Sequence, residues 1–282
     1  MIDAQFIYFT NDETYQQKKN EIAEHSIAFV QDSAKIITHG VEYQYVSWNN
    51  IMDSTEYVDL RLPSKLLWAK YNLGAKSEEE SGLYFQWGDT QGYTAEQVGD
   101  GEGLKAFTWE DYKFSIDGSS SNFSKYNTTD NKTVLDLEDD AAYVSLGGDW
   151  RMPTYEEFKE LCLNTDIFLI TAEGKEIQGT AREQSGSIMI NWASQAEGTL
   201  KGVKFYKKGD KQIYMFVPAS GVAIVGSMQD VGQGGGLWSS SLISSDVQGA
   251  WDFYFDAGNG YVISGNRYVG LPVRPVKQPQ GN

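Results

Sequence analysis

The sequence predicts an α+β fold in which many short strands and long loops surround one or two helices, preceded by a small β-rich module. The 282 residues contain 29 glycines, 8 tryptophans, 17 tyrosines and 13 phenylalanines but only 6 prolines. This composition is typical of short strands joined by tight turns rather than of a helical bundle. One capping motif and a series of strand-length runs then place the individual elements.

The clearest helix signal lies in the stretch DWRMPTYEEFKELCLNT. Thr154 is a residue type that caps helices, and Glu157 three positions later completes a capping box. Phe158, Leu161 and Cys162 then fall on one helical face. We therefore expect a helix over residues 154–164 that buries this face.

The C-terminal part of the chain reads as a series of strands separated by Gly, Asp or Asn turns: GVKFYKKG, KQIYMFVPAS, GLWSSSLIS, AWDFYFD and YVISGNRYVGLPVRPV. Successive strand side chains point to opposite faces. In AWDFYFD, this puts Trp251, Phe253 and Phe255 on one face, which we expect to be buried. Asp252, Tyr254 and Asp256 occupy the other face, which we expect to be exposed and able to bind a ligand.

The chain divides into two predicted regions. Residues 1–58 combine a polar helix-like stretch with three strand-length runs, too few for a large core, and we expect an attachment or oligomerisation module. Its two histidines, His25 and His39, read as strand or turn residues rather than as ligands or bases. Residues 59–282 form the predicted ligand-binding domain. Within it, residues 88–133 are too polar for core strands and read as surface loops anchored by Phe107, Trp109 and Tyr112.

Charge and composition exclude several classes of function. A net charge of −16 and a pI near 4.5 argue against nucleic-acid binding, which needs clustered Lys and Arg. No apolar run is long enough for membrane insertion, and the first residues lack the features of a secretion signal. A single cysteine, Cys162, permits neither an intramolecular disulfide nor a cysteine zinc cage. We expect a soluble protein without a cofactor.

One acidic cluster, DLEDD, is a candidate metal site. Asp136, Glu138, Asp139 and Asp140 offer the oxygen ligands that calcium prefers. The cluster lacks the D-x-D-x-D-G spacing of an EF-hand. Helix capping or an ion pair within the loop is the alternative interpretation.

An ordered set of motifs carries a family resemblance over about residues 60–277: LPSKLLWAKYNLGA, YFQWGDTQGY, WRMPTYEEF, FVPASG, GLWSSS and RYVGLPVRPV. They resemble the C-type-lectin-like domain of Bacteroidetes and Fibrobacter surface proteins, the Fibrobacter succinogenes major paralogous domain, which is related in fold to formylglycine-generating enzymes. The resemblance implies a C-type-lectin-like fold for residues 59–282. Formylglycine generation needs cysteine chemistry, and the only cysteine lies in the predicted helix, so the resemblance does not imply that activity. The calcium-dependent sugar motifs EPN, QPD and WND are absent as well.

The same C-terminal pattern, WSSS through VRPV, is similar to the variable proteins of diversity-generating retroelements. The stretch HSIAFVQDSAKIITHGVEYQYV resembles a segment of tail proteins of phages that infect Bacteroides. In variable proteins, adenine mutagenesis of AAC-type codons cannot yield Lys, Glu, Gln, Met or Trp. Residues 239–276 contain no Lys, Glu or Met, and only Gln248 and Trp251 from that set. The alternative is that a compact β-rich end simply disfavours long charged side chains.

The resemblance implies two sets of site residues. The varied, outward positions are expected to be Ile243, Ser245, Asp246, Val247, Gly249, Asp252, Tyr254, Asp256, Tyr261, Ile263, Gly265 and Tyr268. The structural frame is expected to be Trp238, Trp251, Phe253, Phe255 and Arg274. For Arg274 we expect hydrogen bonds to loop carbonyls or a carboxylate.

These observations predict a non-enzymatic receptor-binding protein of a phage tail or a bacterial cell surface. The expected partner is a bacterial surface protein or glycan, with a homo-oligomer possible through residues 1–58. Tyrosine, common in this sequence, gives contact area and a polar tip at low entropic cost. Two alternatives stay open: a cell-surface adhesin domain without variability, and an enzyme built on the fold of the formylglycine-generating proteins.

Overall fold

A computed structural model describes residues 6–9, 17, 27–30, 35–38, 41–44 and 56–279. The chain forms two compact units, Met1–Ser54 and Thr55–Asn282. The predicted boundary after residue 58 lies inside the second unit, because strand β5 (Tyr57–Val58) pairs with β6 (Leu67–Ala69). The boundary therefore precedes β5.

The first unit contains a four-stranded sheet with the order β1-β2-β3-β4. Strand β1 runs parallel to β2, and the other neighbours are antiparallel. The strands are β1 (Phe6–Phe9), β2 (Ile27–Val30), β3 (Lys35–Thr38) and β4 (Val41–Gln44). Strands β2, β3 and β4 coincide with the three predicted strand-length runs, SIAFVQD, SAKIITHG and VEYQYVSW. Strand β1 was not predicted. His25 and His39 lie outside the described residues.

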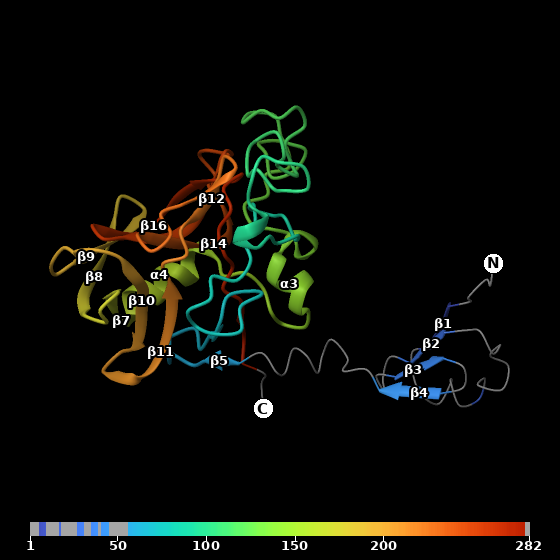
Figure 1. Cartoon of the computed structure of the whole chain (residues 1–282), viewed down its shortest axis with the longest axis horizontal. Coiled ribbons are helices and arrows are strands. Elements are labelled where there is room, and N and C mark those ends of the chain that lie inside the picture. The colour runs from blue at the N-terminus through green and yellow to red at the C-terminus, as the bar shows by residue number, and fades with distance from the viewer. Residues whose placement is uncertain are drawn as a thin grey trace. The chain divides into compact units, whose positions relative to one another are not determined.

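The second unit is built on a curled, antiparallel eight-stranded sheet with the order β11-β10-β7-β8-β9-β16-β15-β14. Figure 1 shows the sheet bending around helix α4 (Tyr155–Asn164). The strands are β7 (Thr165–Thr171), β8 (Glu176–Gln184), β9 (Ser187–Trp192), β10 (Leu200–Lys207), β11 (Asp210–Pro218), β14 (Gly234–Leu242), β15 (Gly249–Asp256) and β16 (Asn259–Asn266).

The remaining elements are short. Strand β17 (Val276–Lys277) pairs with β6 on the side opposite β5, and β12 (Val222–Ile224) pairs with β13 (Ser227–Gln229). Within residues 56–279, the helical segments besides α4 are α3 (Ala141–Leu146) and the 3-10 turns η2 (Ala95–Gln97) and η3 (Leu137–Asp139). In the described part of the chain, no helix has the length and apolar character to span a membrane.

The predicted α+β class, with its C-type-lectin-like fold, is wrong. The structure is 40% strand and only 10% helix, and its main feature is the curled sheet. The error has a physical reason. Strands distant in sequence, such as β9 and β16, pair across the middle of this sheet, and local sequence patterns do not reveal such pairings.

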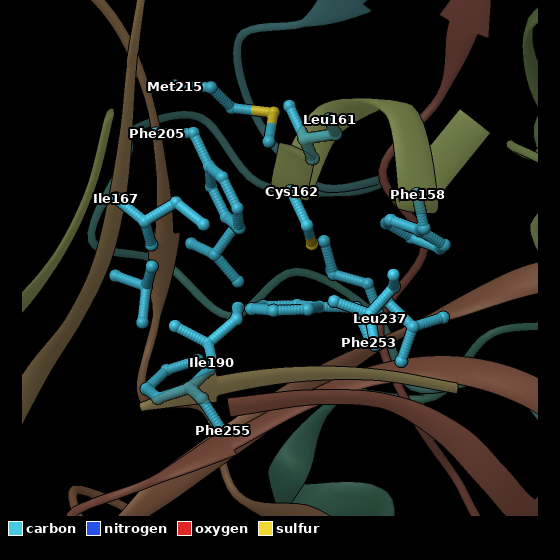
Figure 2. Close-up of a cluster of buried hydrophobic side chains, with 14 of the residues drawn as sticks. Phe158, Leu161, Cys162, Ile167, Ile190, Phe205, Met215, Leu237, Phe253 and Phe255 are labelled. Carbon is cyan, nitrogen blue, oxygen red and sulfur yellow. The ribbon is translucent and has the colours of Figure 1, made fainter. Parts of the chain in front are cut away.

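Helix α4 confirms the capping-box prediction. The Thr154 hydroxyl accepts a hydrogen bond from the Glu157 N–H, and the Glu157 carboxylate accepts one from the Thr154 N–H. The helix directs Phe158, Leu161 and Cys162 into the main core, where Figure 2 shows them facing side chains of the sheet. Burial raises the pKa of the Cys162 thiol, so this cysteine is a buried apolar residue.

A second core lies between the sheet and a segment that we call the loop lobe, residues 72–152. Trp238, Leu242 and Ala250 of β14 and β15 pack there against lobe side chains such as Phe85 and Trp87. The Trp238 indole N–H donates to the Phe85 carbonyl at 2.8 Å, and the Trp87 indole N–H donates to the Ser239 carbonyl at 2.8 Å. The loop lobe therefore covers part of the sheet face that points away from α4.

The aromatic residues expected to anchor the polar segment 88–133 do so. Phe107 and Tyr112 are buried, and Trp109 packs at the edge of the second core. The Trp109 ring lies 5.5 Å from Tyr112 and 5.4 Å from Phe123, measured between ring centroids. These contacts hold a segment of little regular secondary structure in a defined place.

Candidate ligand-binding face

Strands β15 and β16 pair so that two predicted ligand-binding residues of each strand meet on one face. Asp252 lies opposite Ile263, and Tyr254 lies opposite Tyr261. Residues directly opposite in an antiparallel pair share a face. We call Tyr254, Asp256, Tyr261 and Ile263 the hairpin face. Ile263 is 40% exposed, and the other three are partly exposed.

The opposite face of β15 packs inward as the alternation predicts. Phe253 and Phe255 are fully buried in the main core, and the Phe253 ring lies 6.2 Å from Phe158 of α4. Trp251 is half-buried, and its ring lies 4.2 Å from that of Tyr155. The side chains of β15 thus separate into a packed side and a hairpin-face side.

The loop over residues 243–249, which joins β14 to β15 and includes the first residue of β15, contains five more predicted ligand-binding residues, of which Ile243 and Gly249 are buried. Ser245 and Asp246 are exposed, and Val247 is half-buried. The loop is closed by backbone hydrogen bonds, with the Ile243 N–H donating to the Gly249 carbonyl at 3.0 Å. The Asp246 carboxylate also accepts the Gln248 N–H at 3.0 Å. This loop is ordered by its own backbone.

A buried arginine whose role we did not predict, Arg267, supports the loop 243–249 through hydrogen bonds. The Arg267 guanidinium donates to the Val247 carbonyl at 2.7 Å and to the Tyr126 carbonyl of the loop lobe at 2.8 Å. It also donates to the Tyr112 hydroxyl at 2.8 Å and lies 4.2 Å from the centroid of the Phe123 ring. Arg267 therefore joins the loop 243–249 to the loop lobe.

The rarity of basic residues in this segment could have indicated the structural role of Arg267. Arg267 and Arg274 are the two basic residues of segment 239–276. Arg274 is completely buried and donates to the Asn72 side chain at 2.8 Å, to the carbonyls of Ala69 and Lys70, and to the Phe216 carbonyl at 2.8 Å. We assigned Arg274 to the frame and left Arg267 unassigned, although both guanidinium groups are buried.

Several predicted outward positions are not outward. Ile243 and Asp252 are 8% and 3% exposed, and Gly249 is buried. At Gly265, a Cβ atom would lie 2.4 Å from Asp252 Oδ2 and 3.1 Å from the Trp238 ring, so the position has no room for a side chain. The alternation correctly assigned Asp252 to the face away from α4. It could not show that Trp238 of β14 and Gly265 of β16 lie beside the Asp252 side chain and bury it.

Tyr268 is half-buried and packs partly against the protein. Its ring lies 4.8 Å from Trp109, and the residue packs at the edge of the second core. A different residue, Asp230, was missed by the sequence analysis. It is exposed, has a positive φ of 57°, and accepts a hydrogen bond from the Tyr254 hydroxyl at 3.4 Å. It borders the hairpin face from the turn before β14.

Asp252 is a buried carboxyl group without a hydrogen-bond donor among the described residues. Desolvation alone raises its pKa well above the ordinary value for aspartate. An unpaired charge in such a place is costly, so the group takes up a proton instead. We expect the empty protein to hold Asp252 as the neutral acid.

This state gives Asp252 a specific effect on stability. A pKa that is higher in the folded than in the unfolded protein favours folding only at low pH, and the benefit is lost as the pH rises toward the folded value. Replacing Asp252→Asn is therefore expected to raise the free energy of unfolding at pH 8 more than at pH 4, because the amide need not take up a proton on folding, and each unit of pKa shift is worth about 1.4 kcal/mol. Urea unfolding at pH 4 and pH 8 measures it. A gain of equal size at both pH values would contradict the assignment.

The acidic cluster of the loop lobe surrounds a lysine. Oxygen atoms of Asp136, Glu138 and Asp139 lie within 4.8 Å of one another. The Lys125 ammonium is 2.7 Å from Asp136, 2.7 Å from Glu138 and 2.5 Å from Asp139. It occupies the position that a metal ion coordinated by all three would need.

The fourth metal candidate, Asp140, is turned elsewhere. Its carboxylate caps helix α3 by accepting the N–H groups of Ala142 and Tyr143, and it also accepts the N–H of Met152. The four acidic residues therefore do not form one ligand set. The structure has the ion pair and the helix cap that the alternative interpretation proposed.

Removing the lysine should weaken the loop lobe. Burial opposes the ionisation of Asp139, but hydrogen bonds from Lys113 and Lys125 outweigh it and lower the pKa of this carboxyl. A lowered pKa stabilises the fold above the unfolded value, and the benefit is lost as the pH falls through the folded value. We expect Lys125→Met to cost about 1–3 kcal/mol at pH 7 for this partly exposed network. The loss should shrink as the pH falls below the ordinary aspartate pKa of about 3.9. Urea unfolding measures both, and an equal loss at both pH values would argue against the ion pairs.

No family model matches the sequence, and neither a curated protein nor a solved structure matches it. The resemblances to variable proteins and to phage tail proteins therefore stay predictions. The features of this chain that bear on its function are the hairpin face, the loop 243–249 and the residues that support them.

Proposed function

We propose that this chain is a non-enzymatic ligand-binding protein. Its hairpin face and the loop 243–249 contact a protein or glycan of a bacterial surface, and the chain acts on a phage tail or on a cell surface. The observation that carries the proposal is structural. Exposed Tyr, Asp, Ser and aliphatic side chains stand on backbone that the eight-stranded sheet and the buried Arg267 hold in place.

Rigid support of this kind favours binding. A preorganised surface loses less conformational entropy when it meets a ligand, and tyrosine offers a large contact area with few rotatable bonds. Tyr254 and Tyr261 are paired across β15 and β16. Ser245 and Asp246 add hydrogen-bonding groups from the adjoining loop. Together they form a surface with aromatic and polar elements.

The second part of the proposal is that this surface is varied by a retroelement. Support comes from the lack of Lys, Glu and Met in residues 239–276. The predicted positions that are at least partly exposed and have room for other side chains are Ser245, Asp246, Val247, Tyr254, Asp256, Tyr261, Ile263 and Tyr268. A reverse transcriptase gene beside a near-copy of these codons that differs at adenines is expected in the neighbouring DNA. If the reverse transcriptase gene and the near-copy are both missing, the proposal of variability is wrong. The proposal of ligand binding does not depend on this result.

Ligand binding is tested with labelled protein and intact cells. Fluorescent full-length chain is added to a panel of Bacteroides strains, and bound protein is measured by flow cytometry. We expect saturable binding to at least one strain, and at least a tenfold loss for Tyr254→Ala/Tyr261→Ala, because aromatic anchors carry much of the energy of such interfaces.

The matched control is Tyr57→Ala/Tyr143→Ala, which removes two tyrosines from β5 and α3 of the same unit. Circular dichroism must show both variants folded. Equal binding by the Tyr254→Ala/Tyr261→Ala variant and the wild-type protein would rule out the hairpin face as the contact surface.

A further inference from the structure

The hairpin face and its surroundings carry negative charge. Asp256 belongs to the face, Asp230 borders it, and Asp246 lies in the adjoining loop. The carboxylates of these three aspartates accept hydrogen bonds from backbone N–H groups and from the Tyr254 hydroxyl. Among the described residues, no lysine or arginine forms a salt bridge with any of the three. Their charge is therefore available to a ligand.

The basic residues of the same segment do not offset this charge. Arg267 and Arg274 are both buried and donate to groups inside the protein. Following the strand register from Tyr254 through Tyr261 and Met189, the first basic side chain is Arg182 on β8. Three strand spacings separate it from Tyr254, about 14 Å. The surroundings of Tyr254 are thus acidic.

Three aspartates act on Tyr254 in particular. Asp252 and Asp256 stand two positions to either side of it on the same face of β15, and Asp230 accepts its hydroxyl hydrogen bond. Burial and then the negative charges of Asp230 and Asp256 raise the pKa of Tyr254 to about 12. The Tyr254 ring therefore lies in a negative electrostatic field.

Asp252 is the independent observation that points to a ligand. It is 3% exposed and has no donor among the described residues, although a buried polar group normally has one. It belongs to the same strand face as Tyr254 and Ile263, with its Oδ2 beside Gly265. A carboxyl group kept there without a partner costs stability. A ligand that donates to it would recover that cost.

We propose that the ligand group bound at this face is a cation, an ammonium or guanidinium, that packs on the Tyr254 ring and pairs with Asp252, while Asp230 and Asp256 add negative charge at the far end of the face. This inference rests on the proposed function and names the chemical class of its ligand. Cations are attracted to the faces of aromatic rings, and hydrogen bonds between a cation and a carboxylate are about twice as strong as neutral ones.

Binding of a cation would ionise Asp252 and release its proton to the solvent, so the affinity should rise with pH. The titratable groups that face Asp252 are Tyr254 on its own strand, Tyr261 on β16, and Asp230 and Asp256 at the far end of the face. Trp238, its partner on β14, does not titrate. Arg267 is directed toward the loop lobe.

The test uses n-butylammonium as the probe and the full-length chain labelled with nitrogen-15. Two-dimensional amide spectra follow the titration, with 1-butanol and butyrate as neutral and anionic analogues of the same length. We expect saturable shifts of amides in β15 and β16 with butylammonium alone. Asp252→Asn should weaken the affinity about tenfold, the effect of losing one hydrogen bond to a charged group. Tyr254→Leu, which keeps an apolar side chain without a π system, should weaken it several-fold.

The control variant is Asp117→Asn, which neutralises an exposed aspartate of the loop lobe and should bind like the wild-type protein. Equal shifts with 1-butanol, or an unchanged affinity for Asp252→Asn and Tyr254→Leu, would overturn the inference. If cells bind the hairpin face but butylammonium does not, the cationic ligand is wrong and the proposed function stands. If cell binding survives Tyr254→Ala/Tyr261→Ala, the proposed function fails whatever the probe does.

Discussion

Replacing Arg267→Met is expected to lower the free energy of unfolding by about 3–5 kcal/mol, the usual cost of breaking a buried charged network from one side. The substitution leaves the carbonyls of Tyr126 and Val247 without their donors, and Tyr112 loses a hydrogen bond to its hydroxyl. It also removes the cation that lies against Trp87, Tyr112 and Phe123. The loop 243–249 and the loop lobe should loosen together.

Urea unfolding gives the size of this effect, and cell binding below the unfolding transition gives its functional consequence. Arg267→Lys keeps the charge but not the planar set of donors, so we expect it to recover only part of the stability. Arg182→Met, which alters an exposed arginine on β8, is the matched control. A loss below about 1 kcal/mol for Arg267→Met would place this residue among ordinary surface positions.

Replacing Arg274→Met is expected to cost about as much, ~3–5 kcal/mol, for a related reason. Arg274 donates to the Asn72 side chain, to two carbonyls at the end of β6, those of Ala69 and Lys70, and to the Phe216 carbonyl of β11. Burial lowers the pKa of its guanidinium to about 9, which still leaves it charged at neutral pH. Its removal takes the donor from four acceptors in two chain segments, residues 69–72 and β11.

The two arginine variants should differ in function. Arg274 has no contact with the loop 243–249, so Arg274→Met should bind cells normally at temperatures where it is folded. Arg267→Met should bind weakly even there, because the loop has lost its support. Calorimetry locates the unfolding temperatures, and flow cytometry well below them compares the two. Equal loss of binding by both folded variants would contradict the role assigned to Arg267.

Local patterns predicted the parts of the fold that depend on local interactions. The capping box at Thr154 and Glu157 predicted α4, because its hydrogen bonds join residues three apart. The alternation in AWDFYFD predicted which side of β15 packs on α4, because strand geometry alone decides it. These features needed no knowledge of distant segments.

The remainder depended on contacts between distant parts of the chain. Asp252 is buried beside Trp238 of β14 and Gly265 of β16, and no pattern within β15 contains this information. Arg267 is central because segments more than a hundred residues apart supply its acceptors. The fold class was wrong for the same reason, since the order of the eight strands is set by long-range pairing.

The central claim, that the hairpin face and the loop 243–249 bind the ligand, is tested most directly by carboxyl footprinting. The 39 Asp and Glu residues allow an amine label to map the protein surface. The full chain is labelled with and without outer-membrane vesicles from a strain that it binds, and mass spectrometry measures each site. We predict that the vesicles protect Asp230, Asp246 and Asp256 while exposed carboxylates such as Asp117 and Glu183 react as before. Protection of Asp117 or Glu183 with unchanged labelling of the other three would contradict the account.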